Sequence, residues 1–371
     1  MSLKDIFCQN KAIFILQRAF AAGKMPHAYI FAGIEGVGKY KTACEWAKLL
    51  LCEDVINEGD FADSCGRCES CRSFEAGSHP DFNLVYKELM QYTKDNKGKT
   101  TPLELPIDVI REFLIEKVSN RPGLSKRRVF VVSEAEKLNN SSQNAMMKVL
   151  EEPPAYCCII LLCTRMEKLL PTTKSRCRII RFSHIDEDKI IEKLEQMGTG
   201  KKQAQYFARL AQGSLGRGCQ LAELELADAN LYETKKEVIN SLADCQYRDS
   251  LELARRLVDE SKNIADIWGK LETSTSKSDI NRRSQKILVG IIISALYDAM
   301  KLNVTGEKGL TNFDQKTQLK KLAERFDTET AGEKIADCYR TLRWIEAAVN
   351  EKLIFDQLLL NLAVSDTIGV R

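Results

Sequence analysis

Along the first half of the chain, apolar stretches alternate with stretches of helical periodicity, a pattern typical of an α/β domain. Strands are predicted at residues 28–32, 82–86, 129–132, 157–163 and 178–182. The run from 157 to 163 is apolar throughout, as central parallel strands are. Helices are predicted over about 9–22, 41–51, 106–118 and 140–152, because apolar residues recur there on one helical face. We therefore expect an alternating α/β domain over residues 1–183.

Beyond Ser183 the pattern is helical. A small unit over residues 184–228 carries Gly213-Ser-Leu-Gly-Arg217 at a predicted helix start. From 229 to 371, apolar residues recur at helical spacing, for example at Leu288, Ile292, Leu296 and Ala299, and later at Leu342, Ile345, Ala348 and Leu353. This all-α region shows no pattern of metal ligands or nucleophiles, so we expect a helical bundle that packs or oligomerises.

Two segments of the α/β region have distinctive ends or composition. The helix over 140–152 begins with capping-box spacing between Asn140 and Gln143, and Pro153-Pro154 ends it. The stretch from 87 to 106 is polar and contains a charged run at 94–99, which predicts a solvated, mobile loop.

Composition sets limits on size, partners and compartment. With 371 residues and 42.0 kDa, the chain has room for about two to three domains. The net charge of +3 is too small to indicate a nucleic-acid binder, so any DNA contact would come from local patches or from a larger assembly. Thirteen cysteines without an export signal in the first ten residues indicate a cytoplasmic protein with reduced thiols.

The most apolar run of the chain lies at about 287–300. It is interrupted by Gly290, Ser294, Tyr297 and Asp298, so we expect no membrane span.

The candidate nucleotide chemistry centres on a glycine-rich turn, Gly33-Ile-Glu-Gly-Val-Gly-Lys-Tyr40, between the strand at 28–32 and the helix at 41–51. It matches the phosphate-binding P-loop, Gly-x-x-x-x-Gly-Lys followed by Ser or Thr, except at its last position. The candidate phosphate-binding residues are Gly33, Gly36, Gly38 and Lys39. Tyr40 replaces the hydroxyl that ligates Mg²⁺, and a phenol is too long and rigid for that role. We expect ATP to bind weakly or not at all, and hydrolysis to be lost.

A second departure from the ATPase pattern follows the strand at 129–132. A P-loop ATPase needs an Asp there to hold Mg²⁺, followed by a Glu that polarises the attacking water. Ser133 occupies the Asp position and Glu134 follows it. Because a serine supplies no negative charge, the ligands of Mg²⁺ at positions 40 and 133 are both missing, which indicates an ATPase that has lost its activity. We interpret Glu134 as a solvated carboxylate at a strand end.

An insertion over about 52–80 interrupts the β/α alternation and is rich in Cys, Gly, Ser and Asp. Its segment Cys65-Gly-Arg-Cys68-Glu-Ser-Cys71 places three thiols at close spacing, and Cys52 at the end of the P-loop helix can complete a set of four. Four thiolates make a closed tetrahedral Zn²⁺ site without an open position, so we expect the ion to hold a small knuckle together and to catalyse nothing.

Two alternatives to this zinc site remain open. An iron–sulfur cluster is the main chemical rival, since similar cysteine spacings serve both. His79 lies nearby and is an alternative fourth ligand. We favour a structural role for His79, because Pro80 and Asp81 follow it directly and the chain then enters a strand.

Together these stretches resemble the clamp-loader AAA+ family of bacterial replication proteins, over most of the chain. The motifs that carry the resemblance are Pro26-His-Ala-Tyr-Ile-Phe-Ala-Gly33, the four-cysteine set, Ser78-His-Pro-Asp81, Asn144-Ala-Met-Met-Lys-Val-Leu-Glu-Glu-Pro-Pro154 and Lys174-Ser-Arg-Cys177. The resemblance implies a RecA-like AAA+ P-loop domain with an inserted zinc knuckle over 1–183. It also implies a helical lid over 184–228 and a helical collar over 229–371, through which five subunits form an open ring.

The resemblance also implies a function and partners. Loaders of this family belong to the DNA polymerase III holoenzyme, and they open a ring-shaped sliding clamp and close it round primer-template DNA. The implied partners are tau/gamma and delta clamp-loader subunits, the sliding clamp and, through the assembled complex, the DNA. In the family, the Arg at the position of Arg176 reaches the γ-phosphate held by the next subunit, so the resemblance implies an arginine finger supplied in trans. Arg178 and Arg181 are alternatives, as the finger or as ligands of DNA phosphates, and a structural salt bridge is the plain alternative for Arg176.

Three interpretations of function follow. We favour a clamp-loader subunit without ATPase activity of its own, because Tyr40 and Ser133 depart from the pattern that the tau/gamma ATPases keep. The main alternative is an active tau/gamma-like ATPase. A zinc-containing DNA-binding or regulatory protein outside replication would need a basic stripe on the knuckle, but the segment from Cys65 to Cys71 holds one Arg and one Glu.

Overall fold

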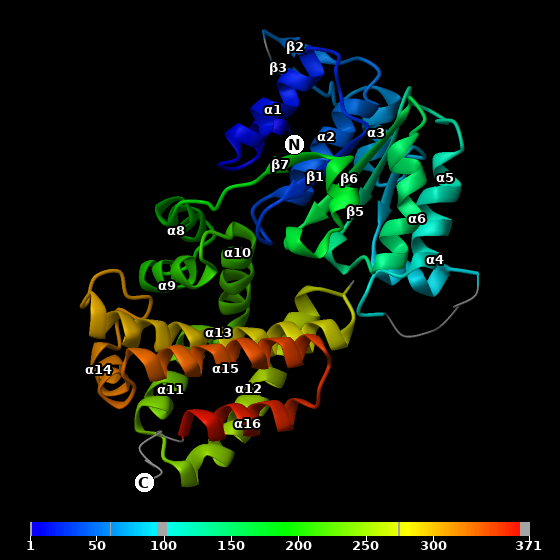
Figure 1. Ribbon diagram of the computed structural model, residues 1–371. Coiled ribbons are helices and arrows are strands. Elements are labelled where there is room, and N and C mark those ends of the chain that lie inside the picture. The colour runs from blue at the N-terminus through cyan, green and yellow to red at the C-terminus, as the bar shows by residue number, and fades with distance from the viewer. Residues whose placement is uncertain (1, 60, 95–101, 274, 364–371) are drawn as a thin grey trace. The chain divides into compact units, whose positions relative to one another are not determined.

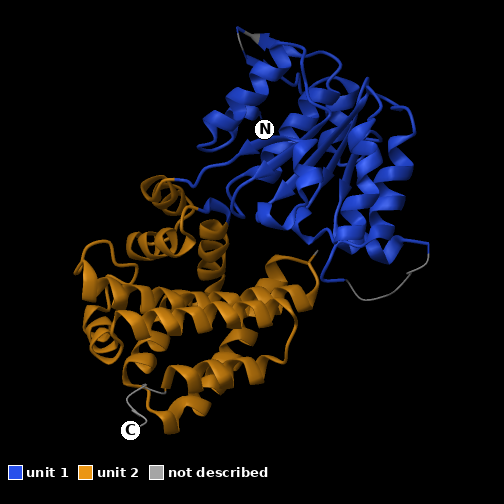
Figure 2. Ribbon diagram, viewed as in Figure 1, with its two compact units in different colours: residues 1–185, 214–216 blue, residues 186–213, 217–371 orange. Residues whose placement is uncertain are grey.

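The chain forms two compact units in the computed structural model, which describes residues 2–59, 61–94, 102–273 and 275–363 (Figure 2). Unit 1 comprises residues 1–185 together with 214–216, and unit 2 comprises residues 186–213 and 217–371. The division into three domains at 183/184 and 228/229 stays a prediction.

Unit 1 is built on a five-stranded parallel sheet of order β4-β5-β6-β1-β7 (Figure 1). Its strands are β1 (Ala28–Ala32), β4 (Phe82–Val85), β5 (Arg128–Val132), β6 (Cys157–Cys163) and β7 (Arg178–Arg181). Every residue of the three central strands β5, β6 and β1 is buried, which explains their unbroken apolar runs. The predicted parallel α/β fold is confirmed, and each predicted strand ends within one residue of the observed one.

Helices cover both faces of this sheet. They are α1 (Asn10–Ala21), α2 (Lys39–Leu51), α3 (Glu69–Glu75), α4 (Ile107–Ile110), α5 (Glu116–Val118), α6 (Asn140–Glu151) and α7 (Pro171–Ser175). A π-helical turn, Arg111–Ile115, joins α4 to α5, so the helix predicted over 106–118 is continuous. A two-stranded antiparallel hairpin, β2 (Ile56–Glu58) and β3 (Phe61–Asp63), and the short helix α3 form the insertion.

The alternation of side chains along the strands creates two apolar cores. On one face, Phe31 of β1 shares a core with Trp46 of α2 and with residues of α1. On the other face, Ile30 shares a core with Val109 of α4 and Leu150 of α6. The P-loop helix and the helix predicted from 140 therefore pack on opposite faces of the sheet.

Local details of unit 1 differ from the sequence predictions. The capping box between Asn140 and Gln143 is wrong: the N-cap of α6 is Asn139, whose Oδ1 accepts from the N–H of Ser142 at 2.9 Å. Gln143 is buried and donates to the carbonyls of Leu138 and Lys168 instead. The segment expected to be a loop begins with a 3₁₀ helix, Lys87–Tyr92, and residues 95–101, with most of the charged run, lie outside the described residues.

Unit 2 is all-α, as predicted. Its helices are α8 (Glu187–Gln196), α9 (Lys201–Ala211), α10 (Leu215–Leu224, whose first two residues belong to unit 1), α11 (Leu231–Asp244), α12 (Ser250–Leu271), α13 (Lys277–Val304), α14 (Lys316–Arg325), α15 (Thr328–Glu346) and α16 (Glu351–Ala363). Helix α13 packs against α12, α14 and α15, and α12 packs against α16 (Figure 1).

Helix α13 is long and apolar enough to cross a membrane by length and composition. Within unit 2, 61% of its most apolar window is buried, which fits a core helix. Leu288, Leu296 and Ala299 lie in this core, as their spacing predicts. The later group does not form one face, because α15 ends at Glu346 and Ala348 has a positive φ of 56° that no helix continues.

Candidate functional sites

The turn between β1 and α2 has the backbone that a P-loop requires. Gly36 and Gly38 have φ values of 76° and 98°, in the left-handed region that favours glycine. At Gly33, a Cβ would lie 2.9 Å from the Cβ of Phe182, so the close approach of neighbouring chain excludes a side chain there. All four candidate phosphate-binding residues therefore lie in one turn at the carboxyl end of β1, where ligands of parallel sheets bind.

The ammonium group of Lys39 is bound by its own loop. Its Nζ donates to the carbonyl oxygens of Gly33 at 2.7 Å and Ile34 at 2.6 Å. Lys39 is 7% exposed, and burial lowers the pKa of its ammonium although the carboxylates of Glu136 and Glu35 oppose the shift. A phosphate would have to draw this group away from two short hydrogen bonds.

A second segment, residues 214–216, forms hydrogen bonds with the P-loop backbone at Glu35 and Gly36. The hydroxyl of Ser214 donates to the carbonyl of Glu35 at 2.7 Å, and the N–H of Gly216 donates to the carbonyl of Gly36 at 2.8 Å. A Cβ at Gly216 would lie 2.8 Å from the Cα of Gly36. The sequence predicts a helix start at the motif Gly213-Ser-Leu-Gly-Arg217 but does not predict its contact with the P-loop. The pair of glycines is the signal that could have indicated a close backbone approach.

Both positions that lack a magnesium ligand, Tyr40 and Ser133, follow the carboxyl ends of strands in the parallel sheet. Tyr40 is half exposed, and burial together with the Cys44 thiol raises the pKa of its phenol to about 12. Ser133 follows β5 directly, and its N–H donates to the carbonyl of Val85 at 2.8 Å. The strand order places the ends of β5 and β1 on either side of β6. The protein thus presents a neutral phenol and a hydroxyl where a P-loop ATPase presents a hydroxyl and a carboxylate.

Of the carboxylates of Glu134 and Glu136, that of Glu136 acts on the charge of Lys39. Glu134 has a φ of 51° and forms an ion pair with Lys137, with its side chain 41% exposed, as expected of a solvated carboxylate. Glu136 accepts from the N–H of Thr164 at 3.1 Å and from its hydroxyl. Sequence spacing does not single out Glu136, because its approach to Thr164 follows a left-handed residue, Glu134, that no sequence pattern indicates.

The four predicted metal ligands converge. The Sγ atoms of Cys52, Cys65, Cys68 and Cys71 all lie within 4.8 Å of one another, and those of Cys52 and Cys68 are 4.0 Å apart. Zn–S bonds of about 2.3 Å place thiolates roughly 3.8 Å apart in a tetrahedron, so the set fits a zinc ion after a small contraction. The cluster that the sequence predicts is therefore present and could hold a zinc ion, while an iron–sulfur cluster remains the chemical alternative.

Backbone N–H groups surround these sulfur atoms, as they do around metal-bound thiolates. The N–H groups of Cys65, Cys68 and Cys71 each donate to the preceding sulfur of the set at 3.3 Å. Burial raises the pKa of Cys71. At Cys65 burial also acts upward, but the backbone donors of Arg67 and Cys68 outweigh it and lower the pKa to about 7. Backbone donors thus favour the thiolate at Cys65, whereas burial raises the pKa of Cys52 and Cys71.

His79 lies outside the four-thiol set. Its Nδ1 accepts from the N–H of Asp81 at 3.0 Å, and its Nε2 lies 2.9 Å from the hydroxyl of Ser70. Burial lowers the pKa of its imidazole against the opposing charge of Asp81. Both ring nitrogens are therefore engaged in hydrogen bonds within the protein.

Arg176 is held by residues of its own unit. It caps the C-terminus of α7, and its guanidinium forms an ion pair with Glu151 at 2.7 Å and donates to the carbonyl of Thr172 at 3.0 Å. Its side chain is 33% exposed. Arg178 and Arg181 lie exposed on the adjoining strand β7.

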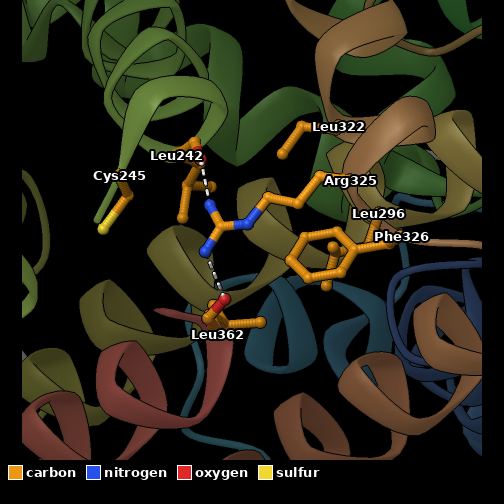
Figure 3. A pocket seen from close by; sticks show the side chains of 7 residues that line it. All are labelled: Leu242, Cys245, Leu296, Leu322, Arg325, Phe326 and Leu362. Atoms are coloured by element: carbon orange, nitrogen blue, oxygen red, sulfur yellow. Dashed lines mark hydrogen bonds between the residues drawn. The ribbon is translucent and has the colours of Figure 1, made fainter. Parts of the chain in front are cut away.

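A small apolar pocket in unit 2 contains one charged group (Figure 3). It is lined by Leu242, Cys245, Leu296, Leu322, Arg325, Phe326 and Leu362. The guanidinium of Arg325 donates to the carbonyls of Leu242 at 3.3 Å and Leu362 at 3.0 Å, at the C-terminal ends of α11 and α16. With a volume of about 10 Å³, the cavity has room for about one water molecule, so Arg325 serves as a helix cap and the pocket as a packing gap.

Two family models match the amino-acid sequence. The model described as "DNA polymerase III, delta subunit" matches residues 8–186, and "DNA polymerase III, delta subunit, C terminal" matches residues 278–363.

Individual relatives are similar at about the same level. The chain is 29% identical to DNA polymerase III subunit tau of Salmonella typhimurium, over 69% of this chain and 38% of that protein. It is 30% identical to subunit delta' of Escherichia coli, over 62% of each chain, and 26% identical to subunit delta' of Bacillus subtilis, over 61% of this chain and 64% of that one. The chain thus spans between about a third and two thirds of the relatives it matches. Among solved structures, a gamma subunit-related protein of Thermotoga maritima aligns with a TM-score of 0.42 and 15% identity, over 95% of this chain and 98% of that one.

Proposed function

The chain belongs to the clamp-loader subunits of DNA polymerase III, and we propose that within this family it is a delta-prime-like subunit that does not hydrolyse ATP itself. It is similar to both delta' and tau proteins at about 30% identity, so identity alone does not separate the two kinds. The observation that carries the proposal is the pair Tyr40 and Ser133, which removes both ligands of Mg²⁺ at one sheet edge.

The state of the P-loop supports this proposal. Lys39 donates to Gly33 and Ile34, and residues 214–216 occupy the carbonyls of Glu35 and Gly36. A nucleotide phosphate accepts hydrogen bonds, so it must compete with the carbonyls of Gly33 and Ile34 for the ammonium of Lys39. Without a metal, the γ-phosphate also lacks the charge stabilisation that phosphoryl transfer requires. The proposed role is that of a structural subunit whose nucleotide pocket is closed or only weakly filled.

Measurement of ATP turnover tests this first proposal. The purified chain should show no turnover above background with Mg²⁺, and Tyr40→Thr combined with Ser133→Asp is the converse test. Either change alone should do little, because the metal needs both ligands. Steady turnover by the unaltered chain that Lys39→Ala abolishes would falsify the proposal and favour an active tau/gamma-like ATPase.

The second part of the proposed function is to supply an arginine to the ATP site of a neighbouring subunit. Arg176 would act as an arginine finger, which meets charge on the transferred phosphoryl group with two hydrogen bonds and in other hydrolases contributes on the order of 10³ to 10⁵ in rate. Its support is the partial exposure of the guanidinium and its attachment to one exchangeable carboxylate, Glu151.

The proposed assembly follows the family. We propose that the chain has an AAA+ domain, a lid and a collar with the boundaries predicted above, and that it works in the cytoplasm. The proposed partners are the tau/gamma and delta subunits, the sliding clamp and primer-template DNA.

Reconstitution tests the finger. The loader is assembled with its tau/gamma and delta subunits and with Arg176→Ala in this chain alone, and ATP hydrolysis stimulated by clamp and DNA is measured. Assembly should be retained while turnover and clamp loading fall. Arg178→Ala and Arg181→Ala are the matched comparisons on β7. If Arg176→Ala leaves both activities unchanged while one of the other two lowers them, that residue takes the role; if all three leave them unchanged, the finger is not in this segment.

A further inference from the structure

The motif Ser78-His-Pro-Asp81 takes no part in the phosphate or metal chemistry described above, yet it buries two ionisable side chains in unit 1. His79 is 6% exposed and Asp81 is fully buried. The motif lies between the cysteine-bearing insertion and strand β4. We call residues 52–76, which carry the four cysteines, β2, β3 and α3, the metal module.

Two serine hydroxyls connect the metal module to the end of the P-loop helix. Ser70, between Cys68 and Cys71, donates its hydroxyl to the carbonyl of Leu51 at 2.7 Å. Ser125, in the turn before β5, donates its hydroxyl to the same carbonyl at 2.8 Å. Leu51 is the last residue of α2, so these hydroxyls satisfy a carbonyl that the helix leaves without an internal partner. The next residue is the first metal ligand, Cys52.

The imidazole of His79 completes the connection. Its Nε2 lies 2.9 Å from the Oγ of Ser70 and 3.2 Å from the Oγ of Ser125. The two Oγ atoms also lie 3.2 Å apart, so the protonation of the ring, and not these distances, decides whether Nε2 donates or accepts. The Nδ1 of His79 accepts from the N–H of Asp81 and carries no proton. The geometry therefore assigns the tautomer with the proton on Nε2.

Asp81 holds the third element in place. One carboxylate oxygen accepts from the N–H of Gly123 at 2.7 Å and from the guanidinium of Arg128 at 3.1 Å. The other accepts from the N–H groups of Leu124 and Ser125 at 2.8 and 2.9 Å. Asp81 thus fixes the turn that presents Ser125, while its own N–H fixes the ring of His79.

From these contacts we infer that His79 is a positioning residue that locks the metal module to the C-terminal end of α2 and to the turn at 123–125, so that the three open and close as one unit. The other contacts of α3 with unit 1 include the Lys48–Glu75 ion pair and the packing of Phe74 on Phe82, with ring centroids 4.8 Å apart. Those contacts lie farther along α3 and leave Ser70 and the Leu51 carbonyl to the imidazole network. Loss of the hydrogen bonds of His79 should therefore increase the mobility of residues 65–71 before that of the rest of the metal module.

Amide hydrogen exchange on the full chain tests this inference. His79→Ala should raise exchange about tenfold in peptides covering 65–76 and 121–127, while β1 and β6 keep their protection. It should also speed transfer of zinc from the protein to a colorimetric chelator about tenfold, in the range known for residues that support metal ligands. His184→Asn, at an exposed histidine of the same unit, is the matched control and should change neither measurement.

Two graded variants separate the halves of the imidazole. Asn supplies an acceptor near the position of Nδ1 but does not reach the serines, whereas Gln reaches the position of Nε2 with a donor. His79→Gln should therefore restore protection at 65–76 and slow zinc release more than His79→Asn. This order would not be expected if His79 only started strand β4.

A variant outside both the motif and the metal module guards against simple misfolding. Ser125→Ala removes one hydroxyl, and it should raise exchange at 65–76 and speed zinc release although it is far from the cysteines in sequence. If Ser125→Ala leaves 65–76 and zinc release unchanged, or if the exchange changes in His79→Ala stay confined to 79–82, the three elements are not coupled and the inference is overturned.

Discussion

Arg176 and Glu151 form an ion pair in which a guanidinium nitrogen lies 2.7 Å from a carboxylate oxygen. The pair joins the end of α7 to the last residue of α6, and both residues belong to motifs that carry the family resemblance. Glu151 therefore holds the guanidinium of Arg176 within unit 1. For Arg176 to meet a phosphate of a neighbour, it must exchange this carboxylate for the phosphate.

Glu151→Gln should separate the effect of losing the ion pair from the effect of losing the guanidinium of Arg176. The side chains of Arg176 and Glu151 are 33% and 48% exposed, so solvent screens the pair and the free energy of unfolding by urea should change by less than about 1 kcal/mol. In the reconstituted loader, ATP turnover should be retained, because the guanidinium remains. Glu152→Gln, at the next exposed position, is the control. A loss of turnover as large as that of Arg176→Ala would show that Glu151 itself is required.

Metal content tests the cysteine cluster. The purified chain should carry about one zinc, and Cys68→Ser should lose it while unit 1 keeps its sheet, because the closed site stabilises a local module. Elemental analysis and far-UV circular dichroism are the measurements, and Cys8→Ser, outside the cluster, should keep the metal. Iron with sulfide in place of zinc, or no metal in protein prepared without chelators, would contradict this prediction.

Lys39 should contribute to stability even without a nucleotide. Lys39→Met removes a charged donor from the carbonyls of Gly33 and Ile34, which should lower the free energy of unfolding by roughly 1–3 kcal/mol. Lys41→Met, at an exposed position of the same helix, should have a smaller effect. Equal stability of the two variants would mean that the bonds of Lys39 to its own loop contribute nothing.

Buried thiols should make the protein sensitive to alkali. Burial raises the pKa of Cys157 to about 12, and burial together with Glu136 raises that of Cys163 to about 11. Their ordinary pKa is about 8.5, so the stability they contribute is complete below that pH and is lost as the pH rises toward 11. Urea unfolding should show a loss of about 1–2 kcal/mol per thiol by pH 10. Cys163→Ala should reduce this slope and Cys8→Ser should not; the same slope in both variants would exclude Cys163 as a source.

The sequence predicted those parts of unit 1 whose signal is local. Buried strands such as β6 are apolar without interruption. The spacing of the cysteines alone indicates a metal site. The binding of Gly216 to Gly36 could not be predicted in this way, because it depends on an approach between residues about 180 positions apart. Glu136 was missed for a different reason, since the left-handed turn at Glu134 changes the direction of the chain.

The predicted N-cap of α6 was wrong by one residue, because two adjacent asparagines can each serve as its N-cap. Asn139 and Asn140 are equally suited to cap α6, and the structure uses the first, which turns Gln143 inward. The outcome is decided by the buried carbonyls of Leu138 and Lys168, which need a donor.

Strand β7 stands at the end of the sheet order, next to β1, and its sequence is Arg178-Ile-Ile-Arg181. A strand at the edge of a sheet offers backbone groups that can pair with any other extended chain, and apolar edge strands are starting points for aggregation. The exposed arginines at both ends of β7 place two positive charges along this edge, so a second copy that approaches in the same way meets like charge. Charge at the strand ends therefore disfavours edge-to-edge pairing between copies of this chain.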